Sequence, residues 1–115
     1  MVDQSLRGQA GNSKWIKATD VKIIVSTDAG FLVYHGENAG ELEELVKGGF
    51  TPMEAIVAAT RNSVECLGLE QHIGTLEAGK YADLVIVDGD PLADIRILQD
   101  KNKIVQVFKS GQRVK

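Results

Sequence analysis

The chain opens its regular patterning with a short apolar, β-branched run. Val21, Ile23, Ile24 and Val25 form this run, and only Lys22 interrupts it. A nearly continuous apolar run is typical of a strand that is covered on both faces, as in parallel sheets. The polar turn Ser26-Thr27-Asp28-Ala29-Gly30 follows directly. The pattern therefore predicts a buried strand over 21–25 that ends in this turn.

Helical periodicity replaces the strand pattern further along the chain. Apolar residues at helical spacing predict a helix over 37–47, with the glycine pair 48–49 ending it: Leu42, Leu45 and Val46 face inward, and Glu41, Glu43 and Glu44 face outward. Thr51, Pro52 and Glu54 then form a capping-box arrangement at the start of a second helix. We expect Thr60 to cap a further helical stretch that reaches residue 67.

The last third of the chain changes to a strand pattern. Strands are expected over 82–87 and 103–109, with a short helix over 94–100 between them. Ser110-Gly111 should turn the chain after the second strand. His72 is expected on the surface, in a turn.

Asp28 is the first candidate for chemistry. An acidic side chain at the carboxyl end of a buried parallel strand lies where barrels and doubly wound sheets build their active sites. The alternative is that Asp28 caps a helix or fixes a turn, which are common roles for aspartate. The five residues of the turn do not decide between the two.

The order of motifs after Asp28 resembles a known family. Thr51-Pro52-Met53-Glu54-Ala55, Leu67-Gly68-Leu69 and the block from Gly74 to Asp94 are similar to the carboxyl-terminal end of the metal-dependent amidohydrolase superfamily, in its imidazolonepropionase and prolidase-like branch. The resemblance runs from Val21 to Val114. It implies an α/β fold, with the last strand of a (β/α) barrel and its following helices over 19–70 and strands of a small β-sandwich over 71–115. Residues 1–18 are expected to form a flexible lead.

The resemblance also implies a site. Asp28 matches the aspartate that ends the eighth barrel strand, contacts a divalent metal, most often zinc, and takes a proton from the attacking water. His35 follows shortly after it, either as a second ligand or, as the family pattern more often has it, as a residue at the substrate mouth. The sequence departs from the family pattern in having Ser26 where many relatives have Gly, and Ser63-Val64 where relatives often have Pro-Ala.

The metal ligands that the family requires are mostly missing from this sequence. The chain has two histidines, His35 and His72, and no His-x-His pair, whereas a catalytic zinc site needs about three protein ligands. Three hypotheses follow: the carboxyl-terminal part of a hydrolase of C–N bonds that is inactive alone and binds no metal tightly, a non-catalytic module that associates with itself, or one half of a split enzyme.

Composition narrows the class of protein. The chain has 115 residues, is 43% hydrophobic and has a net charge of −3, which fits one folded domain without the basic surface of a nucleic-acid-binding protein. No apolar stretch approaches the roughly 20 residues that span a bilayer, and the start does not resemble a signal peptide. The single cysteine, Cys66, fits a reducing cytoplasm and is expected to be buried as a small apolar residue.

The partners expected from the sequence are other polypeptides. A barrel strand needs a neighbouring parallel strand and a crossover helix, which this chain does not contain, and unpaired strand edges are templates for association. We expect a homo-oligomer or a complementing polypeptide, with Trp15, Phe31 and Tyr34 as interface anchors.

Overall fold

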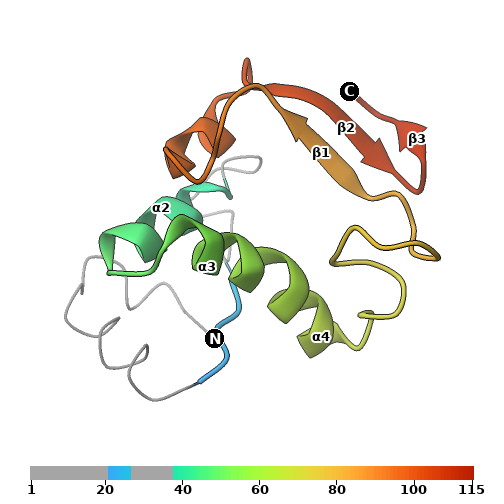
Figure 1. Cartoon of the computed structure of the whole chain (residues 1–115), viewed down its shortest axis with the longest axis horizontal. Helices are drawn as coiled ribbons and strands as arrows, with labels where there is room; N and C mark the ends of the chain where they lie inside the picture. The colour runs from blue at the N-terminus through green and yellow to red at the C-terminus, as the bar shows by residue number, and fades with distance from the viewer. Residues whose placement is uncertain (1–20, 27–37) are drawn as a thin grey trace.

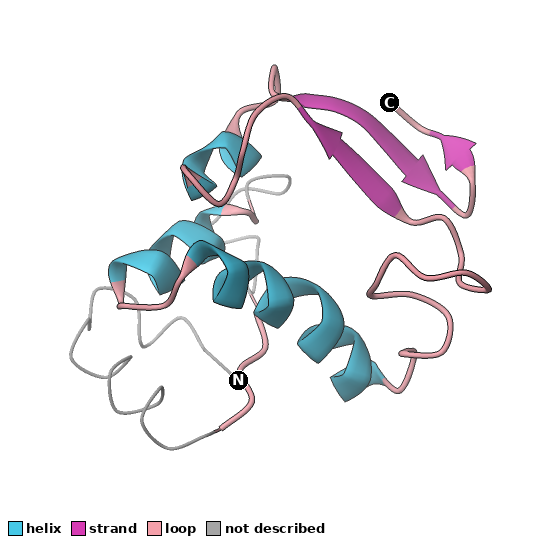
Figure 2. Cartoon of the chain, in the orientation of Figure 1, coloured by secondary structure: helices cyan, strands magenta, loops and turns pink. Residues whose placement is uncertain are grey.

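The computed structural model describes residues 21–26 and 38–115. Helices form one part of the molecule and a small sheet forms another, with the chain between α4 and β1 joining them (Figure 1). Figure 2 shows the same separation of helix from strand. The elements are α2 Gly40–Lys47, α3 Pro52–Val57, a π-helical turn Ala58–Asn62, α4 Ser63–Leu67, β1 Leu84–Val87, a 3-10 helix Ile95–Gln99, β2 Ile104–Lys109 and β3 Gln112–Arg113.

Helix α2 packs through an apolar face that also contains one glutamate. Leu42 and Leu45 are buried, as the periodicity predicts. Glu41 is buried as well, with 3% of its surface exposed, so the expectation that it faces outward is wrong. Residues four apart lie on the same face of a helix, and Glu41 precedes Leu45 by four positions. Glu43 and Glu44 are half-buried and lie beside Lys47.

The second helix begins with the capping box that the sequence predicts. The backbone N–H of Glu54 donates to the Thr51 hydroxyl at 3.1 Å, and the backbone N–H of Thr51 donates to the Glu54 carboxylate at 2.9 Å. The helix then continues without a break through the π-helical turn into α4. The expectation that Thr60 caps a new helix is wrong, because its hydroxyl donates to the Ile56 carbonyl at 2.7 Å within the continuous helix.

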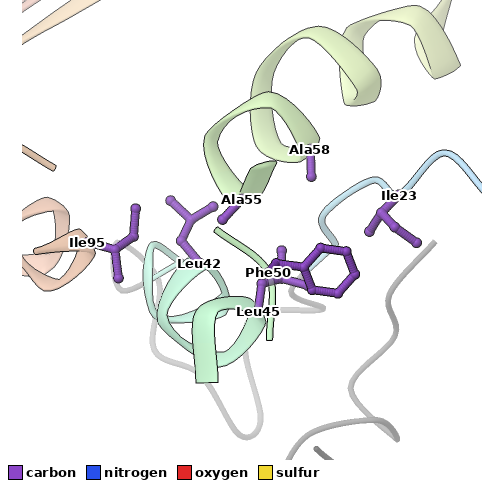
Figure 3. Packing of buried hydrophobic residues seen from close by; sticks show 7 residues of the cluster. All are labelled: Ile23, Leu42, Leu45, Phe50, Ala55, Ala58 and Ile95. Carbon is purple, nitrogen blue, oxygen red and sulfur yellow. The ribbon is translucent and has the colours of Figure 1, made fainter. Parts of the chain in front are cut away.

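The buried core lies where the helices meet the 21–26 segment and the 3-10 helix. Small side chains allow close packing, since Ala55 is fully buried and Ala58 is 3% exposed. Figure 3 shows the ring of Phe50 directed toward Ile23. The full cluster is Ile23, Leu42, Leu45, Phe50, Ala55, Ala58 and Ile95.

The sheet is antiparallel, in the order β1-β2-β3. Leu84 pairs with Phe108 and Val85 with Val107, and the register shifts by a bulge after Ile86. Both expected strands are confirmed, although β1 begins two residues later than predicted. The turn at Ser110-Gly111 is confirmed too, with both residues at positive φ (51° and 78°), as a tight hairpin turn requires.

The predictions for residues 21–25 and for Cys66 are wrong, whereas the prediction for His72 is confirmed. Residues 21–24 do not form a regular strand, and only Val25 makes an isolated β-bridge. Val21 is 57% exposed, so coverage on both faces is wrong for the start of this run. Cys66 is exposed, so the expectation that it is buried is wrong, because α4 extends beyond the buried core. His72 lies on the surface in a turn, as expected, and stacks on the ring of Tyr81 at 5.9 Å.

Asp83 ties β1 to the β2–β3 turn. Its carboxylate accepts the backbone N–H of Ser110 at 2.7 Å and contacts the Lys109 ammonium at 3.4 Å. The hydrogen bond from Ser110, followed by the charge of Lys109, lowers the pKa of Asp83 below its usual value of 3.8. The charged form of Asp83 therefore favours the folded sheet.

The capping box gives the first testable expectation. Thr51→Ala removes the hydroxyl that accepts the Glu54 N–H, and should lower the free energy of unfolding by about 1 kcal/mol. Chemical denaturation measures the difference. Thr51→Ser keeps the acceptor and serves as the control, so an equal loss in both variants would contradict the capping role.

Asp83 gives a pH-dependent expectation. Because its pKa is lowered in the folded state, its contribution is present above the usual value of 3.8 and is lost as the pH falls through the lower folded value. Asp83→Asn should therefore be less stable than the wild type at neutral pH, and the difference should shrink in acid. Urea denaturation over a pH series tests this. Asp88→Asn, at a side chain that is 73% exposed, is the matched control, and a gap for Asp83→Asn that does not change with pH would refute the assignment.

Candidate functional site

The structure describes the approach to the candidate site. Asp28 and His35, the residues selected from the sequence, lie outside the described residues, as do the proposed interface anchors Trp15, Phe31 and Tyr34. The described segment 21–26 ends two residues before Asp28. Its contacts with the helices define the point from which the chain continues into the Thr-Asp-Ala-Gly turn.

Two consecutive side chains hold the backbone of this segment. The Asn62 amide nitrogen donates to the Ile23 carbonyl at 3.0 Å. The Ser63 hydroxyl accepts the backbone N–H of Val25 at 3.3 Å. Both side chains come from the junction of the π-helical turn with α4. Because backbone polar groups inside a protein need partners, these bonds replace part of the pairing that a neighbouring strand would provide.

The helix turn that carries these side chains has an unusual geometry. The Ser63 hydroxyl donates to the Ala58 carbonyl at 2.7 Å, so it is a donor toward its own helix and an acceptor toward Val25. The π-helical turn spans Ala58–Asn62. Single π turns inside α-helices are rare and often lie at functional sites. The geometry places an amide and a hydroxyl against the same extended segment.

A third contact anchors the segment at its start. The Lys22 ammonium contacts the Glu65 carboxylate, and the Arg61 guanidinium lies 3.8 Å from the other oxygen of the same group. The hydrogen bond from Lys22 lowers the pKa of Glu65 below its usual value, against the opposing effect of desolvation. Since the Lys22 side chain is 59% exposed, solvent screens this pair and its contribution to stability is small.

The described residues do not form a metal centre by themselves. Over 21–26 and 38–115, no three His, Cys, Asp or Glu side chains are grouped so that they could hold an ion. Cys66 is exposed and His72 stacks on Tyr81, away from any such group. The described part of the chain therefore does not supply the three protein ligands of a zinc site by itself. The described helices instead hold the backbone of the 21–26 segment.

Sequence reasoning did not assign a role to Asn62 or Ser63. An Asn-Ser pair inside a helical pattern gives no chemical signal by itself, because its partner lies about 39 positions earlier in the chain. The available signal was the departure from the Pro-Ala that relatives often have after this asparagine. A serine at that position introduces a hydroxyl next to the 21–26 segment.

Comparison with known proteins gives one consistent family. The model of the amidohydrolase family matches residues 5–114. The ochratoxinase of Aspergillus niger is 33% identical over 117 residues, an alignment that covers all of this chain and 23% of that protein. The imidazolonepropionase of Thermoplasma volcanium is 35% identical over 95 residues, which cover 82% of this chain and 24% of that protein.

Solved structures agree in fold. A Xaa-Pro dipeptidase with bound methionine superposes with a TM-score of 0.83 at 32% identity, over 92% of this chain and 25% of that one. The A. niger ochratoxinase superposes with a TM-score of 0.81 at 32% identity, over 92% of this chain and 24% of that one. The chain thus spans about a quarter of the length of these relatives.

The comparisons confirm the family that the motifs predict. The fold is confirmed as α/β with a small antiparallel sheet, and it superposes on part of larger amidohydrolases. No helix in the described part of the chain is long and apolar enough to cross a membrane. With a family match that covers nearly the whole sequence, this chain belongs to the amidohydrolase family.

Proposed function

We propose that this chain supplies the carboxyl-terminal part of a metal-dependent hydrolase of C–N bonds in amides, cyclic amides or dipeptides. The superposition on the Xaa-Pro dipeptidase, over 92% of this chain, is the observation that carries the proposal. Segment 21–26 corresponds to the last strand of the barrel, and the sheet β1–β3 to part of the small β-sandwich. Two further solved structures that this chain resembles, a molinate hydrolase and phenylurea hydrolase B, support the class of reaction by their names.

In this proposal Asp28 is the metal ligand and general base, and His35 contacts the substrate. A divalent ion, zinc by preference, would supply an activated water when bound. Asp28 would be one of its ligands, and a carboxylate is a group that can act as a general base. One ligand does not complete a zinc site, so activity requires ligands in addition to Asp28. The single cysteine supports a cytoplasmic location.

The alternative proposal is that the chain associates with itself. The exposed apolar side chains of the sheet support either self-association or a complementing polypeptide. No residue of β1, β2 or β3 belongs to the buried core cluster. Val85 is 53% exposed, Ile86 42% and Val105 47%. β1 also lies at the edge of the sheet, where its free side is a template for another strand. Apolar strands exposed in this way support a partner that covers them, either a second copy or the rest of an amidohydrolase.

The proposed reaction is tested with Asp28→Asn. A polypeptide that carries the amino-terminal three quarters of the related dipeptidase or ochratoxinase is mixed with this chain, zinc and a dipeptide or N-acyl substrate. Hydrolysis should appear with the wild type and fall at least about 100-fold with Asp28→Asn, because a general base contributes that much or more.

Asp88→Asn, at an exposed carboxylate, controls for the loss of one negative charge. The chain alone should show no hydrolysis and should keep less than one zinc per chain after dialysis. Equal rates with Asp28→Asn and the wild type, or one tightly held zinc in the isolated monomer, would refute the proposed roles.

Assembly is tested by light scattering at micromolar concentration. The chain alone should be a dimer or larger, and Val85→Lys should shift it toward the monomer, because a charge on the edge strand opposes pairing. Leu76→Lys is the control, since Leu76 is 81% exposed and lies outside the strands. A compact, cooperatively folding wild-type monomer would show that the sheet needs no partner.

A further inference from the structure

We infer that β1 pairs with β1 of a second copy of this chain, antiparallel and about a two-fold axis at Ile86. In the part of the chain that the structure describes, β1 has β2 on one side and no strand on the other. The inference rests on the self-association that is proposed above as the alternative, and it names the surface, the partner and the register. The proposed hydrolysis does not depend on it.

The hydrogen bonds of β2 show where the backbone groups of β1 point. Val107 donates its N–H to the Lys115 carbonyl at 3.3 Å and accepts the N–H of Val114 at 2.8 Å, so its backbone groups are directed away from β1. Val107 lies opposite Val85. In an antiparallel ladder such a pair makes no hydrogen bonds between its own two strands. The N–H and C=O of Val85 therefore point to the free edge of the sheet.

The same alternation gives a second residue of this kind. Asp88 donates its N–H to the Lys103 carbonyl at 2.8 Å, which places the backbone of Asp88 on the β2 side. Backbone groups alternate in direction along a strand. The N–H and C=O of Val87 therefore point to the free edge, as those of Val85 do.

The free edge of β1 is short, and its centre is Ile86. On the other side of Val85, the N–H of Asp83 is already donated to the Tyr81 carbonyl at 2.9 Å. Within β1, Val85 and Val87 thus have both an N–H and a C=O directed outward. A two-fold axis at Ile86 places Val85 of each copy opposite Val87 of the other. Each of these pairs can exchange two hydrogen bonds, so this register uses every outward group of both residues.

The side chains along the edge suit a second copy of the same strand. Val85 is 53% exposed and Ile86 is 42% exposed, and neighbouring residues of a strand point to opposite faces, so apolar surface is open on both sides. Leu84–Val87 has no charged residue and no proline, which are features that protect edge strands from pairing. Because both copies present the same edge, the pairing is closed, and two three-stranded sheets become one sheet.

The charges that flank β1 are compatible with this register. Asp83 precedes the strand and Asp88 follows it. With the axis at Ile86, Asp83 lies opposite Gly89 of the second copy and Asp88 lies opposite Leu84, so no two carboxylates face each other across the new pairing. Each carboxylate also has a lysine of its own chain beside it, at 3.4 Å from Asp83 and 3.9 Å from Asp88: Lys109 and Lys103, respectively.

The first part of the test introduces a proline at the free edge. Because the N–H of Val85 points away from β2, Val85→Pro removes a donor from the edge and none from the ladder between β1 and β2. Light scattering at micromolar concentration should give a dimer for the wild type and a monomer for Val85→Pro. Val85→Ala removes apolar surface but keeps the N–H, so this control should remain a dimer. A monomeric wild type, or the same mass for both variants, would overturn the inference.

The second part tests the register with single cysteines in a Cys66→Ser background, since Cys66 is exposed. Opposite residues that share no hydrogen bonds have Cα atoms about 4.5 Å apart, within the range that a disulfide spans. Ile86→Cys should therefore form a covalent dimer on oxidation. Leu84→Cys should not, because the two copies of this residue lie about 14 Å apart along the strands. Leu76→Cys, at a residue that is 81% exposed and outside the strands, measures cross-linking by collision.

The outcomes separate this inference from the proposals on which it borders. A dimeric wild type in which Ile86→Cys cross-links no more than Leu76→Cys would overturn the pairing of β1 and leave self-association standing. Denaturation curves show whether Val85→Pro folds, and the cysteine yields decide alone if it does not. The hydrolysis proposal is decided by the complementation assay with Asp28→Asn, so it can fail or stand independently of these results. A dimer that Val85→Pro dissociates and Ile86→Cys traps is the result expected.

Discussion

The fold of this chain depends on how an extended segment satisfies its backbone hydrogen bonds. In a sheet, a neighbouring strand accepts and donates these bonds, but no described strand lies beside residues 21–26. Among the described residues, Asn62 and Ser63 provide two such partners from a helix, and Val25 also makes an isolated β-bridge. Because the segment is fixed in this way, Ile23 can lie in the core with Phe50 and Ala58. The same bonds fix the point at which the chain leaves toward Asp28, so packing and the candidate site have one common origin.

Local signals explain why much of the fold could be predicted from the sequence. The capping box at Thr51 and Glu54 involves residues three apart, and the turn at Ser110-Gly111 needs only the backbone preferences of two residues. The family could likewise be predicted, because its motifs are contiguous. The features that the sequence predicts wrongly depend on tertiary contacts or on the exact residue at which an element ends. Cys66 lies near the end of α4, beyond the core. The 21–25 run has the composition of a strand, but no described strand lies beside it.

The candidate site likewise has one part that the sequence indicates and another part that it does not. The sequence indicates Asp28 because an acidic residue directly after an apolar run is visible in it, and this role stays a prediction because Asp28 lies outside the described residues. Asn62 and Ser63 could not be selected, because a helical periodicity does not reveal which side chains meet a segment about 39 residues earlier. The π-helical turn is also invisible to periodicity, since it changes the direction of the side chains without changing their composition.

The described part of this chain thus separates two requirements of a hydrolytic site, its ligands and its geometry. It contains no cluster of metal-binding side chains, yet it holds the backbone that leads to the proposed general base through contacts anchored in the core. The similarity to relatives extends well beyond Asp28, through helices and strands that carry no proposed catalytic group. Asp83, which ties β1 to the turn between β2 and β3, has such a structural role. Similarity that persists over such residues is what a shared scaffold produces, because a fold is maintained by packing and backbone hydrogen bonds as well as by the groups that carry chemistry.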